Sequence, residues 1–240
     1  MFDITIITIN KNNKSGLLRT QASVKEISLN KKNPKFKLEW LIVDGESTDG
    51  SIDVIDQKLA DQFIVDNNGI YSAMNKGIES AKGDRLFFLN SGDVVSKNLH
   101  LVSEYNKNIM LFFESYYMNR FNKIKKTRQR APCYGMPSSH QGIVFPKSEI
   151  RYNTDYKICA DYDYYLQHDV DKEFVPLVES LCEKFGLSFS QPVLIMKEMF
   201  MIRKRHCSIS TALYFLIVDF IKVIIKSFFN VFSFEKKSVK

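Results

Sequence analysis

Residues 66–93 read DNNGIYSAMNKGIESAKGDRLFFLNSGD, and this stretch decides the fold. A helix that opens at a glycine is followed by residues 85–90, whose centre, LFFL, is the short apolar run expected of a strand buried on both faces. Such a strand belongs inside an α/β sheet, and in open α/β sheets ligands bind beyond the carboxyl ends of the strands. Ser91, Gly92 and Asp93 occupy that place, so we expect this turn to meet a ligand.

Asp93 suits one kind of ligand in particular. A carboxylate with oxygen-rich neighbours can bind a hard divalent cation that is shared with substrate phosphates, because Mg²⁺ usually keeps only one or two protein carboxylates. The sequence Asn-Ser-Gly-Asp is also ordinary turn chemistry, which leaves a purely structural turn as the alternative.

Two earlier segments have the same construction. Residues 38–43 form an apolar run that leads into DGESTDG at 44–50, and residues 4–9 end at Asn10-Lys11-Asn12. Three apolar strands, each followed by polar residues and then by a helical segment, predict a parallel nucleotide-binding sheet.

The remaining elements follow from capping residues and apolar spacing. We expect a helix that is capped by Ser15 and runs through Ile27, and a helical stripe over 70–78. The other expected elements are helices starting at Ser51 and covering 98–107 and 181–186, strands over 63–65, 109–118 and 193–196, and a basic surface loop over 123–137.

Length and charge limit the function. The 240 residues suffice for one sizeable α/β domain with an appendage, and the formal charge of +7 gathers at 123–130, 203–205 and 236–240. Basic clusters can bind nucleic acid, anionic lipid or phosphorylated substrates. The sequence has no zinc-finger spacing and no evident recognition helix, which favours lipid or phosphate over nucleic acid.

Cysteine usage and the first residues bear on the compartment. The four cysteines form no C-x-x-C pair, so neither a metal knuckle nor a dense disulfide scaffold is indicated and a reducing compartment fits. MFDITIITIN lacks the positive region and cleavage site of a secretory signal. We expect a cytoplasmic protein.

Residues 211–234 predict a long apolar helix. Its polar members Asp219, Lys222, Lys226 and Asn230 recur every three or four residues and so share one narrow stripe. A transmembrane helix carries few or no charges, so we favour an amphipathic helix lying in the plane of a membrane, between basic residues that attract anionic lipid. A helix packed on the domain or in a homodimer is the alternative.

Several motifs agree on a family. TIITIN at 5–10, VDGESTDGS at 43–51, DNNGIYSAMNKGI at 66–78, GDRLFFLNSGD at 83–93, His140-Gln141 and CADYDYYL at 159–166 together resemble family 2 glycosyltransferases of the GT-A fold. The resemblance is to the small bacterial enzymes of capsule, O-antigen (lipopolysaccharide) and exopolysaccharide assembly. It implies a Rossmann-like, mostly parallel central sheet flanked by helices. Together with the C-terminal pattern, we expect a glycosyltransferase domain at 1–206 and a membrane-associating helix and tail at 207–240.

The resemblance implies a cation site for Mn²⁺ or Mg²⁺. Asp93 aligns with the last carboxylate of the family's D-x-D type motif, and His206 is a candidate for the late histidine that completes the coordination in some relatives. Gly92 departs from the family because many relatives carry a second acid there, and Asn90 likewise replaces an acid. These departures leave one carboxylate at the expected metal site.

The resemblance also implies a donor pocket. Asp44 matches the aspartate that binds the nucleobase edge, and an acceptor-only carboxylate there favours the uracil N–H of a UDP-sugar. A turn or helix-cap role is the alternative for Asp44. The other donor-binding candidates are Thr8, Asn10, Asp66, Asn75, Ser91 and Gly92.

The catalytic base comes from the CADYDYYL segment. Asp161 takes the base position of the relatives, and the N-terminus of the following helix favours its ionised form. Asp163 is a first-turn helix acid by this reading, and that structural role is the alternative for both. His140 and Gln141 match family positions near the acceptor or the donor diphosphate.

The expected reaction is an inverting transfer of a sugar from a nucleotide-sugar donor to a hydroxyl of a glycan or polyprenyl-linked acceptor, at the inner face of the cell membrane. Two other classes stay open. A sugar-phosphate nucleotidyltransferase would need a glycine-rich phosphate loop after the first strand, and residues 10–14 contain no glycine. A non-catalytic nucleotide-sugar binder at the membrane is supported by the missing second acid.

Overall fold

The first strand, β1 (Ile4–Asn10), pairs in parallel with β2 (Leu38–Asp44) on one side and β4 (Arg85–Phe88) on the other. The pairing of β1 with β2 extends from Ile4 opposite Leu38 to Asn10 opposite Asp44, so both strands end at the same edge. The three apolar runs recognised in the sequence are therefore neighbours, and their polar ends lie together.

The computed structural model describes residues 1–30, 33–118, 124–126, 131–136, 138–183 and 191–235. Within this part the sheet order is β3-β2-β1-β4-β8-β6-β9-β5, with β7 paired to β6. The remaining strands are β3 (Gln62–Val65), β5 (Val94–Val95), β6 (Met110–Met118), β7 (Ile124–Lys126), β8 (Ile143–Pro146) and β9 (Lys172–Glu183). The sheet is mixed, because β8 runs antiparallel to both β4 and β6.

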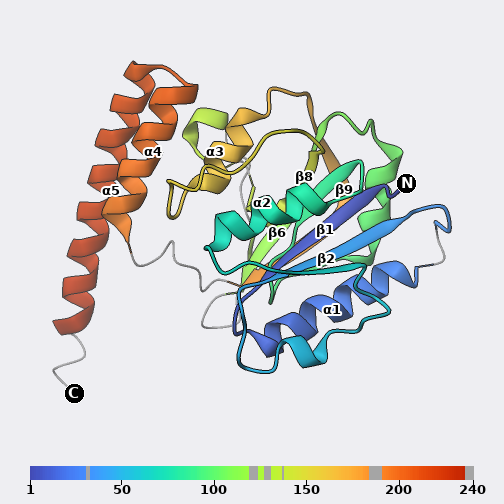
Figure 1. The fold of residues 1–240 in the computed structure, drawn as a ribbon. Helices are drawn as coiled ribbons and strands as arrows, with labels where there is room; N and C mark the ends of the chain where they lie inside the picture. Colours follow the sequence, from blue (N-terminus) through green and yellow to red (C-terminus); the bar gives the residue numbers. More distant parts are fainter. Residues whose placement is uncertain (31–32, 119–123, 127–130, 137, 184–190, 236–240) are drawn as a thin grey trace.

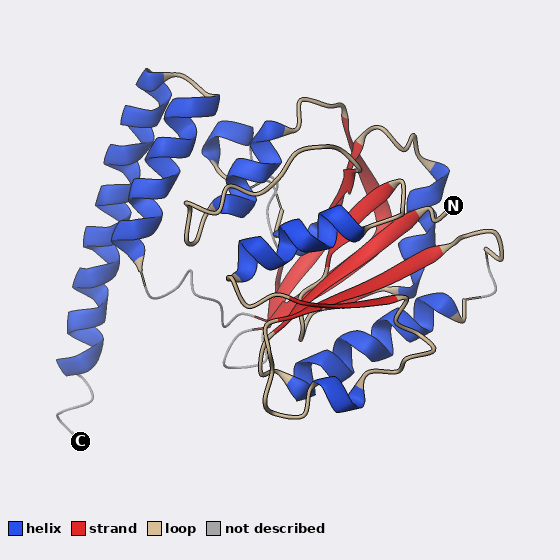
Figure 2. Cartoon of the chain, viewed as in Figure 1, coloured by secondary structure: helices blue, strands red, loops and turns tan. Residues whose placement is uncertain are grey.

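Helices cover both faces of the sheet (Figures 1 and 2). The α-helices are α1 (Lys14–Ser28), α2 (Ile70–Ser80), α3 (Ala160–Gln167), α4 (Pro192–His206) and α5 (Ile209–Glu235), and the 3₁₀ turns are η1 (Ile52–Val54), η2 (Lys97–Glu104), η3 (Pro132–Tyr134) and η4 (His140–Gly142). The predicted α/β class is confirmed, together with the C-terminal helix.

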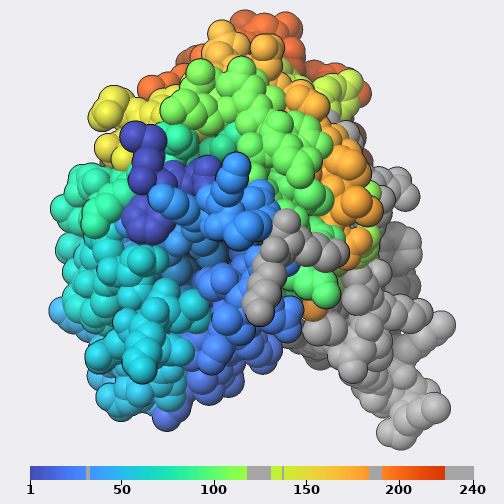
Figure 3. Space-filling model, turned by 90° about the vertical axis from the view of Figure 1, so that its right-hand side faces the viewer, coloured from blue at the N-terminus to red at the C-terminus, as the bar shows by residue number. Residues whose placement is uncertain are grey.

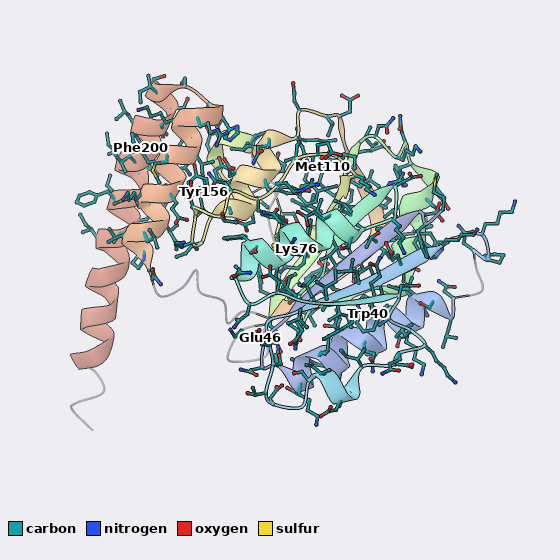
Figure 4. All side chains as sticks on the ribbon, viewed as in Figure 1. Trp40, Glu46, Lys76, Met110, Tyr156 and Phe200 are labelled. Carbon is teal, nitrogen blue, oxygen red and sulfur yellow. A yellow bond between two sulfur atoms is a disulfide. The ribbon has the colours of Figure 1, made fainter. Side chains whose placement is uncertain are left out.

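Alternation along the strands divides the interior into two apolar cores. Ile7 of β1 packs with residues of α2 and α3, whereas Ile4 and Ile6 pack on the other face with residues of α1. Trp40, labelled in Figure 4, belongs to the second core. In the side view of Figure 3 the blue N-terminal segments lie next to the green and orange segments of η2 and β9, which close this second core.

The last two helices form an antiparallel hairpin at one end of the domain, and α5 extends beyond the N-terminal end of α4 (Figure 1). Arg203 of α4 is 2% exposed and ion-pairs with Asp219 of α5 at 2.7 Å. The expected polar stripe of α5 thus turns partly toward α4. The large apolar side chains that α5 leaves exposed are Ile209, Leu213, Tyr214, Ile217, Phe220, Ile221 and Ile224, and Lys222 is exposed among them.

Four local predictions were wrong. The cap of α1 is Asn13, whose side chain accepts the Gly16 N–H, rather than Ser15. Residues 193–196, predicted as a strand, lie in α4, because a short apolar run does not separate strand from helix and Pro192 begins a helix here. Residues 181–183, predicted as helix, end β9, and 184–186 lie outside the described residues.

The fourth wrong prediction is the loop at 123–137, of which residues 124–126 form the strand β7. The pairing of two cysteines was not predicted at all. Cys133 and Cys207 form a disulfide between the η3 turn and the end of α4, although their separation of 74 residues gives no local signal. Cys159 and Cys182 are free and buried.

Two other predictions, those on the basic segments and on the C-terminal helix, can be compared only with the described residues. Residues 123, 127–130 and 137 of the predicted basic loop, and the basic residues 236–240, lie outside the described residues. Among the residues that the structure describes, no helix combines the length and apolar character needed to cross a bilayer.

The aromatic cluster around Phe88 yields a stability prediction. Phe88 is fully buried, with ring contacts to His140, Phe145, Tyr152 and Tyr164. Phe88→Ala should lower the free energy of unfolding by about 3–5 kcal/mol in urea denaturation, because it leaves a cavity in a packed core. Phe63→Ala, at a side chain 41% exposed, is the matched control and should cost about 1 kcal/mol or less. Equal losses for the two variants would contradict this description of the core.

Candidate active site

The site is built at the carboxyl ends of β1, β2 and β4. Asn10 lies opposite Asp44, and its Nδ2 donates to Asp44 Oδ2 at 2.7 Å. The Ser47 N–H and hydroxyl also donate to the Asp44 carboxylate, at 2.7 and 2.8 Å. Glu46, labelled in Figure 4, marks the same loop after β2. Asp44 is therefore a buried carboxylate that organises the turn at the mouth of the sheet.

Asp93 lies in the turn between β4 and β5 and is 3% exposed. Its Oδ1 accepts the Glu183 N–H at 2.8 Å, and Gln141 donates a side-chain hydrogen bond to the same carboxyl. Burial raises the pKa of Asp93 to about 7, against the opposing effects of Gln141, the Asn90 backbone contact and the charge of Arg19. The structure thus brings Asp93 and Gln141 together.

Few oxygen atoms in the turn of Asp93 are candidates to hold a divalent cation. Asn90 Oδ1 is buried and has no hydrogen-bond partner among the described residues, and the Asn90 carbonyl accepts the Asp93 N–H at 2.9 Å. The described residues contain no group of three or more His, Cys, Asp or Glu side chains arranged for a metal. A cation here would rely on few protein oxygens and on the phosphates of the donor, as Mg²⁺ does in many phosphate-binding sites.

The turn around Ser91 is tied to the start of α1. The Ser91 hydroxyl donates to the Asn13 carbonyl, and the Thr20 hydroxyl accepts the Gly92 N–H at 3.0 Å and donates to the Asp93 carbonyl at 2.7 Å. These hydrogen bonds hold the turn against the first half of α1. Ser91 and Gly92 are therefore held beside Asp93, as the sequence predicts.

Asp66 caps the segment that leads into α2. It accepts hydrogen bonds from the Asn68 N–H and from the Ser72 hydroxyl, at 3.0 and 2.7 Å. Burial opposes its charge, but the hydrogen bonds from Ser72 and Asn68 outweigh burial, so the pKa of Asp66 lies below its usual value. Asp66 is thus an ionised carboxylate close to the end of β2, since its N–H donates to the Asp44 carbonyl at 2.9 Å.

Thr8 and Asn75 have structural partners instead. Thr8 is fully buried, and its hydroxyl accepts the indole N–H of Trp40 at 3.0 Å. Asn75 uses both ends of its amide on the backbone of Tyr152, at 2.8 and 2.9 Å. The structure does not bring these two candidates into the site.

Asp161 stands in the first turn of α3, and its Oδ1 accepts the Tyr162 N–H at 2.8 Å. Burial raises the pKa of Asp161 to about 6, and the charge of Glu198 adds to the rise. The carboxylate borders a pocket of about 170 Å³ whose other lining residues are Met136, Ile158, Cys159, Tyr162, Ile195 and Met199. A carboxyl that titrates near pH 6 in an apolar pocket can accept a proton at neutral pH.

The pKa of Tyr117, on β6, responds to both carboxylates, Asp93 and Asp161. The charges of Asp161 and Asp93 both help to raise the pKa of Tyr117, after burial, which is the largest cause. Both carboxylates are therefore close enough to Tyr117 for their charges to act on its hydroxyl, although they lie 68 positions apart in sequence.

The histidines are placed differently from the expectation. His206 Nε2 lies 2.8 Å from Asp163 Oδ1, which is fully buried, so the pair joins α4 to α3. His140 lies within the aromatic cluster, its Nε2 2.6 Å from the Tyr152 hydroxyl, and burial lowers the pKa of His140 to about 3. The neutral His140 ring cannot act as a cation toward a diphosphate.

Glu198 of α4 was missed by the sequence analysis. Its carboxylate is 2% exposed and accepts the N–H groups of Lys157, Ile158 and Cys159, at 2.7, 3.0 and 2.9 Å. These are the residues that lead into Asp161. Tyr156, labelled in Figure 4, lies in the same segment and contacts Arg205 of α4. A lone acid within the apolar sequence LIMKEMF was the only available signal.

Carboxylates beyond the strand ends of a Rossmann-like sheet define a nucleotide-binding α/β protein. The family model for glycosyl transferase family 2 matches residues 5–159, and the chain belongs to this family. It is therefore a glycosyltransferase, and the family predicted from the motifs is confirmed.

The similar sequences are named as glycosyltransferases too, in agreement with the family model. An uncharacterized glycosyltransferase of Mycobacterium tuberculosis (strain CDC 1551 / Oshkosh) is 27% identical over 200 residues, which cover 75% of this chain and 74% of the relative. The uncharacterized glycosyltransferase YfnE of Bacillus subtilis (strain 168) is 22% identical over 175 residues, covering 67% of this chain and 43% of YfnE.

Two structures share the fold at low sequence identity. S. aureus TarS 1–349 in complex with UDP superposes with a TM-score of 0.64 at 13% identity, over 88% of this chain and 68% of TarS 1–349. The mannosyltransferase PcManGT from Pyrobaculum calidifontis, in complex with GDP-Man and Mn²⁺, gives a TM-score of 0.62 over 89% of this chain and 69% of PcManGT. The GT-A type fold is thereby confirmed.

Glu198 yields a prediction about the Asp161 carboxyl. Glu198→Gln removes a negative charge near Asp161, so the pKa of Asp161 should fall, as followed by carboxyl ¹³C NMR with Asp161→Asn assigning the signal. The free energy of unfolding should drop by about 1–3 kcal/mol, because buried N–H groups lose acceptors. Glu149→Gln, at a fully exposed side chain, removes the same charge and should change neither quantity. An unchanged pKa of Asp161 in Glu198→Gln would contradict the coupling.

Proposed function

We propose that the protein transfers a sugar with inversion from a UDP-sugar to a hydroxyl, with Asp93 on the leaving-group side and Asp161 as the base. The observation that carries the proposal is that the two carboxylates lie on different elements, Asp93 buried in the turn after β4 and Asp161 beside a pocket in the first turn of α3. An in-line displacement needs groups on opposite sides of the reacting carbon, and two carboxylates from separate elements can supply them.

Each residue has one task in this proposal. Asp161 accepts the proton of the acceptor hydroxyl as that oxygen attacks the anomeric carbon. Glu198 holds the backbone before Asp161 through three hydrogen bonds and so orients the base. Asp66 binds the nucleoside part of the donor, and the buried Asp44 orders the turn beside it, with Asn10 and Ser91 at the adjoining strand ends.

A divalent cation, Mn²⁺ or Mg²⁺, would be held by Asp93, with Gln141 hydrogen-bonded to the same carboxyl. When bound, it supplies positive charge that stabilises the departing diphosphate. Support comes from the raised pKa of Asp93, which reports a buried carboxyl without a strong countercharge. PcManGT, a protein of the same fold, is described with Mn²⁺.

The pocket beside Asp161 suggests the chemistry of the acceptor. Four of its lining side chains, Met136, Ile158, Ile195 and Met199, are apolar and could contact a lipid portion or the apolar face of a sugar. We therefore propose a polyprenyl-linked or glycan acceptor, as in bacterial capsule and lipopolysaccharide synthesis. We propose UDP as the donor's nucleotide, with which TarS is described, whereas PcManGT, of the same fold, is described with GDP-Man.

We further propose that residues 207–240 attach the domain formed by residues 1–206 to the inner face of the membrane. The exposed side of α5 carries apolar residues such as Leu213, Ile217 and Phe220. An apolar helix face beside basic residues binds anionic lipid surfaces. The same face in a homodimer is the alternative.

A non-catalytic nucleotide-sugar binder is the second candidate, favoured only by the absence of an acid at Gly92. The transferase predicts turnover, whereas the binder predicts donor affinity without UDP release. A nucleotidyltransferase would instead release diphosphate from a nucleoside triphosphate.

Asp161→Asn separates these functions. UDP release with a lipid-linked acceptor should fall by about 10²–10⁴-fold, because the base can no longer accept a proton, while UDP-sugar affinity by calorimetry should change by no more than about twofold. Asp155→Asn, at an exposed position in the preceding loop, is the control and should retain turnover. Full turnover in Asp161→Asn would remove Asp161 from the mechanism.

The pH profile gives an independent prediction. The base must be ionised, and the pKa of Asp161 is raised to about 6, so at saturating Mn²⁺, which keeps Asp93 ionised, kcat/KM should be level near neutral pH and fall about tenfold per pH unit well below pH 6. An acidic limb near the ordinary aspartate pKa would show that another group is the base.

Membrane attachment is tested by vesicle sedimentation. Ile217→Glu with Phe220→Glu places two charges on the exposed face of α5 and should reduce binding to anionic vesicles by at least about tenfold. Leu29→Glu, at the C-cap of α1 and 68% exposed, should leave binding unchanged. Unchanged binding in the double variant, with loss of a dimer in sedimentation velocity, would favour the homodimer.

A further inference from the structure

The family's second metal acid is missing at Gly92, and the structure shows what fills its place. Gly92 has a φ of 107°, which side chains rarely adopt. A Cβ built there would lie 2.6 Å from Glu183 Oε2 and 2.8 Å from Glu183 Cδ. The carboxylate of Glu183 thus stands where a side chain at position 92 would project.

Glu183 reaches this place from the end of β9. Its N–H donates to Asp93 Oδ1 at 2.8 Å, so its backbone is fixed against the expected metal ligand. Pairing of β9 with β6, where Glu183 lies opposite Met118, and with β5 sets this register. The position of Glu183 therefore depends on the fold and not on a local turn.

The Glu183 side chain is accessible, and among the described residues its ionic partner is Arg19. It is 47% exposed and pairs with the guanidinium of Arg19 from α1, itself 50% exposed. Exposed ion pairs contribute little to stability, so a divalent cation can displace Arg19 from this carboxylate at small cost. Arg19 then acts as a monovalent substitute when no cation is bound.

We propose that Glu183 is the second carboxylate of the cation site, supplied from β9 in the space that Gly92 leaves open. The inference rests on the proposed function, since it completes the site at Asp93. Two carboxylates with donor phosphates and water form the oxygen-rich set that Mg²⁺ and Mn²⁺ accept. The substitution explains how a chain with glycine at position 92 can keep a metal site.

The test is Mn²⁺ binding to the full chain in the presence of UDP, measured by loss of the EPR signal of free Mn²⁺. Glu183→Gln should raise the Kd for Mn²⁺ at least about tenfold. Glu179→Gln removes the same charge from an exposed position of the same strand and should change the Kd by less than about twofold. Arg19→Gln should not weaken binding, because it removes the competing cation.

A second variant distinguishes a ligand from a neighbouring charge. Glu183→Cys offers a soft thiolate, which should weaken Mn²⁺ binding and strengthen Cd²⁺ binding relative to the wild type, as measured by Cd²⁺ competition against Mn²⁺. A charge that acted only at a distance would not transfer preference to a soft metal. The wild type, which keeps Cys159 and Cys182, sets the baseline.

The outcomes separate the two proposals. Wild-type Mn²⁺ affinity with UDP, together with an unchanged Kd in Glu183→Gln, would overturn the role of Glu183 and leave the Asp93 site standing. Equal losses in Glu183→Gln and Arg19→Gln would reduce Glu183 to a salt-bridge partner. If the wild type binds no Mn²⁺ with UDP, the cation site of the proposed function falls, and Glu183 with it.

Discussion

The hydrogen bond from the Glu183 N–H to Asp93 Oδ1 is the contact on which the rest of the site depends. Asp93 follows the parallel strands of the N-terminal half, and Glu183 ends the long strand β9, 90 positions later in the sequence. A buried carboxylate needs such a donor, and the strand needs a fixed end. This bond, added to the strand pairing of β5 with β9, ties the expected cation ligand to the end of β9.

The segment that precedes Asp161 is held by the buried Glu198 carboxylate of α4. Glu198 reaches from α4 to the three N–H groups before Asp161, while Arg203, one turn further along, joins the same helix to Asp219 of α5. The helical hairpin is thus connected to the base through buried ionic contacts. We propose that α5 contacts a membrane or a second copy of the chain, and α4, its partner in the hairpin, holds the segment before the base. Attachment and chemistry thus involve the same hairpin.

Much of this architecture was predictable from the sequence, for a physical reason. Uninterrupted apolar runs such as LFFL identify buried parallel strands, and polar residues at their ends mark the ligand edge. The groups that escaped prediction, Glu183, Glu198 and the disulfide partner Cys207, act on residues 90, 39–41 and 74 positions away. Their local sequence carries no trace of those partners. The short run at 193–196 failed for another reason, because four apolar residues fit strand and helix equally well.

The central claim is that Asp93 and Asp161 face one bound nucleotide sugar from two sides. A crystal structure of the Asp161→Asn variant with UDP-sugar and Mn²⁺ tests this most directly. The account predicts the diphosphate beside Asp93 and the anomeric carbon turned toward residue 161. A nucleotide bound elsewhere, or one whose sugar points away from α3, would contradict it.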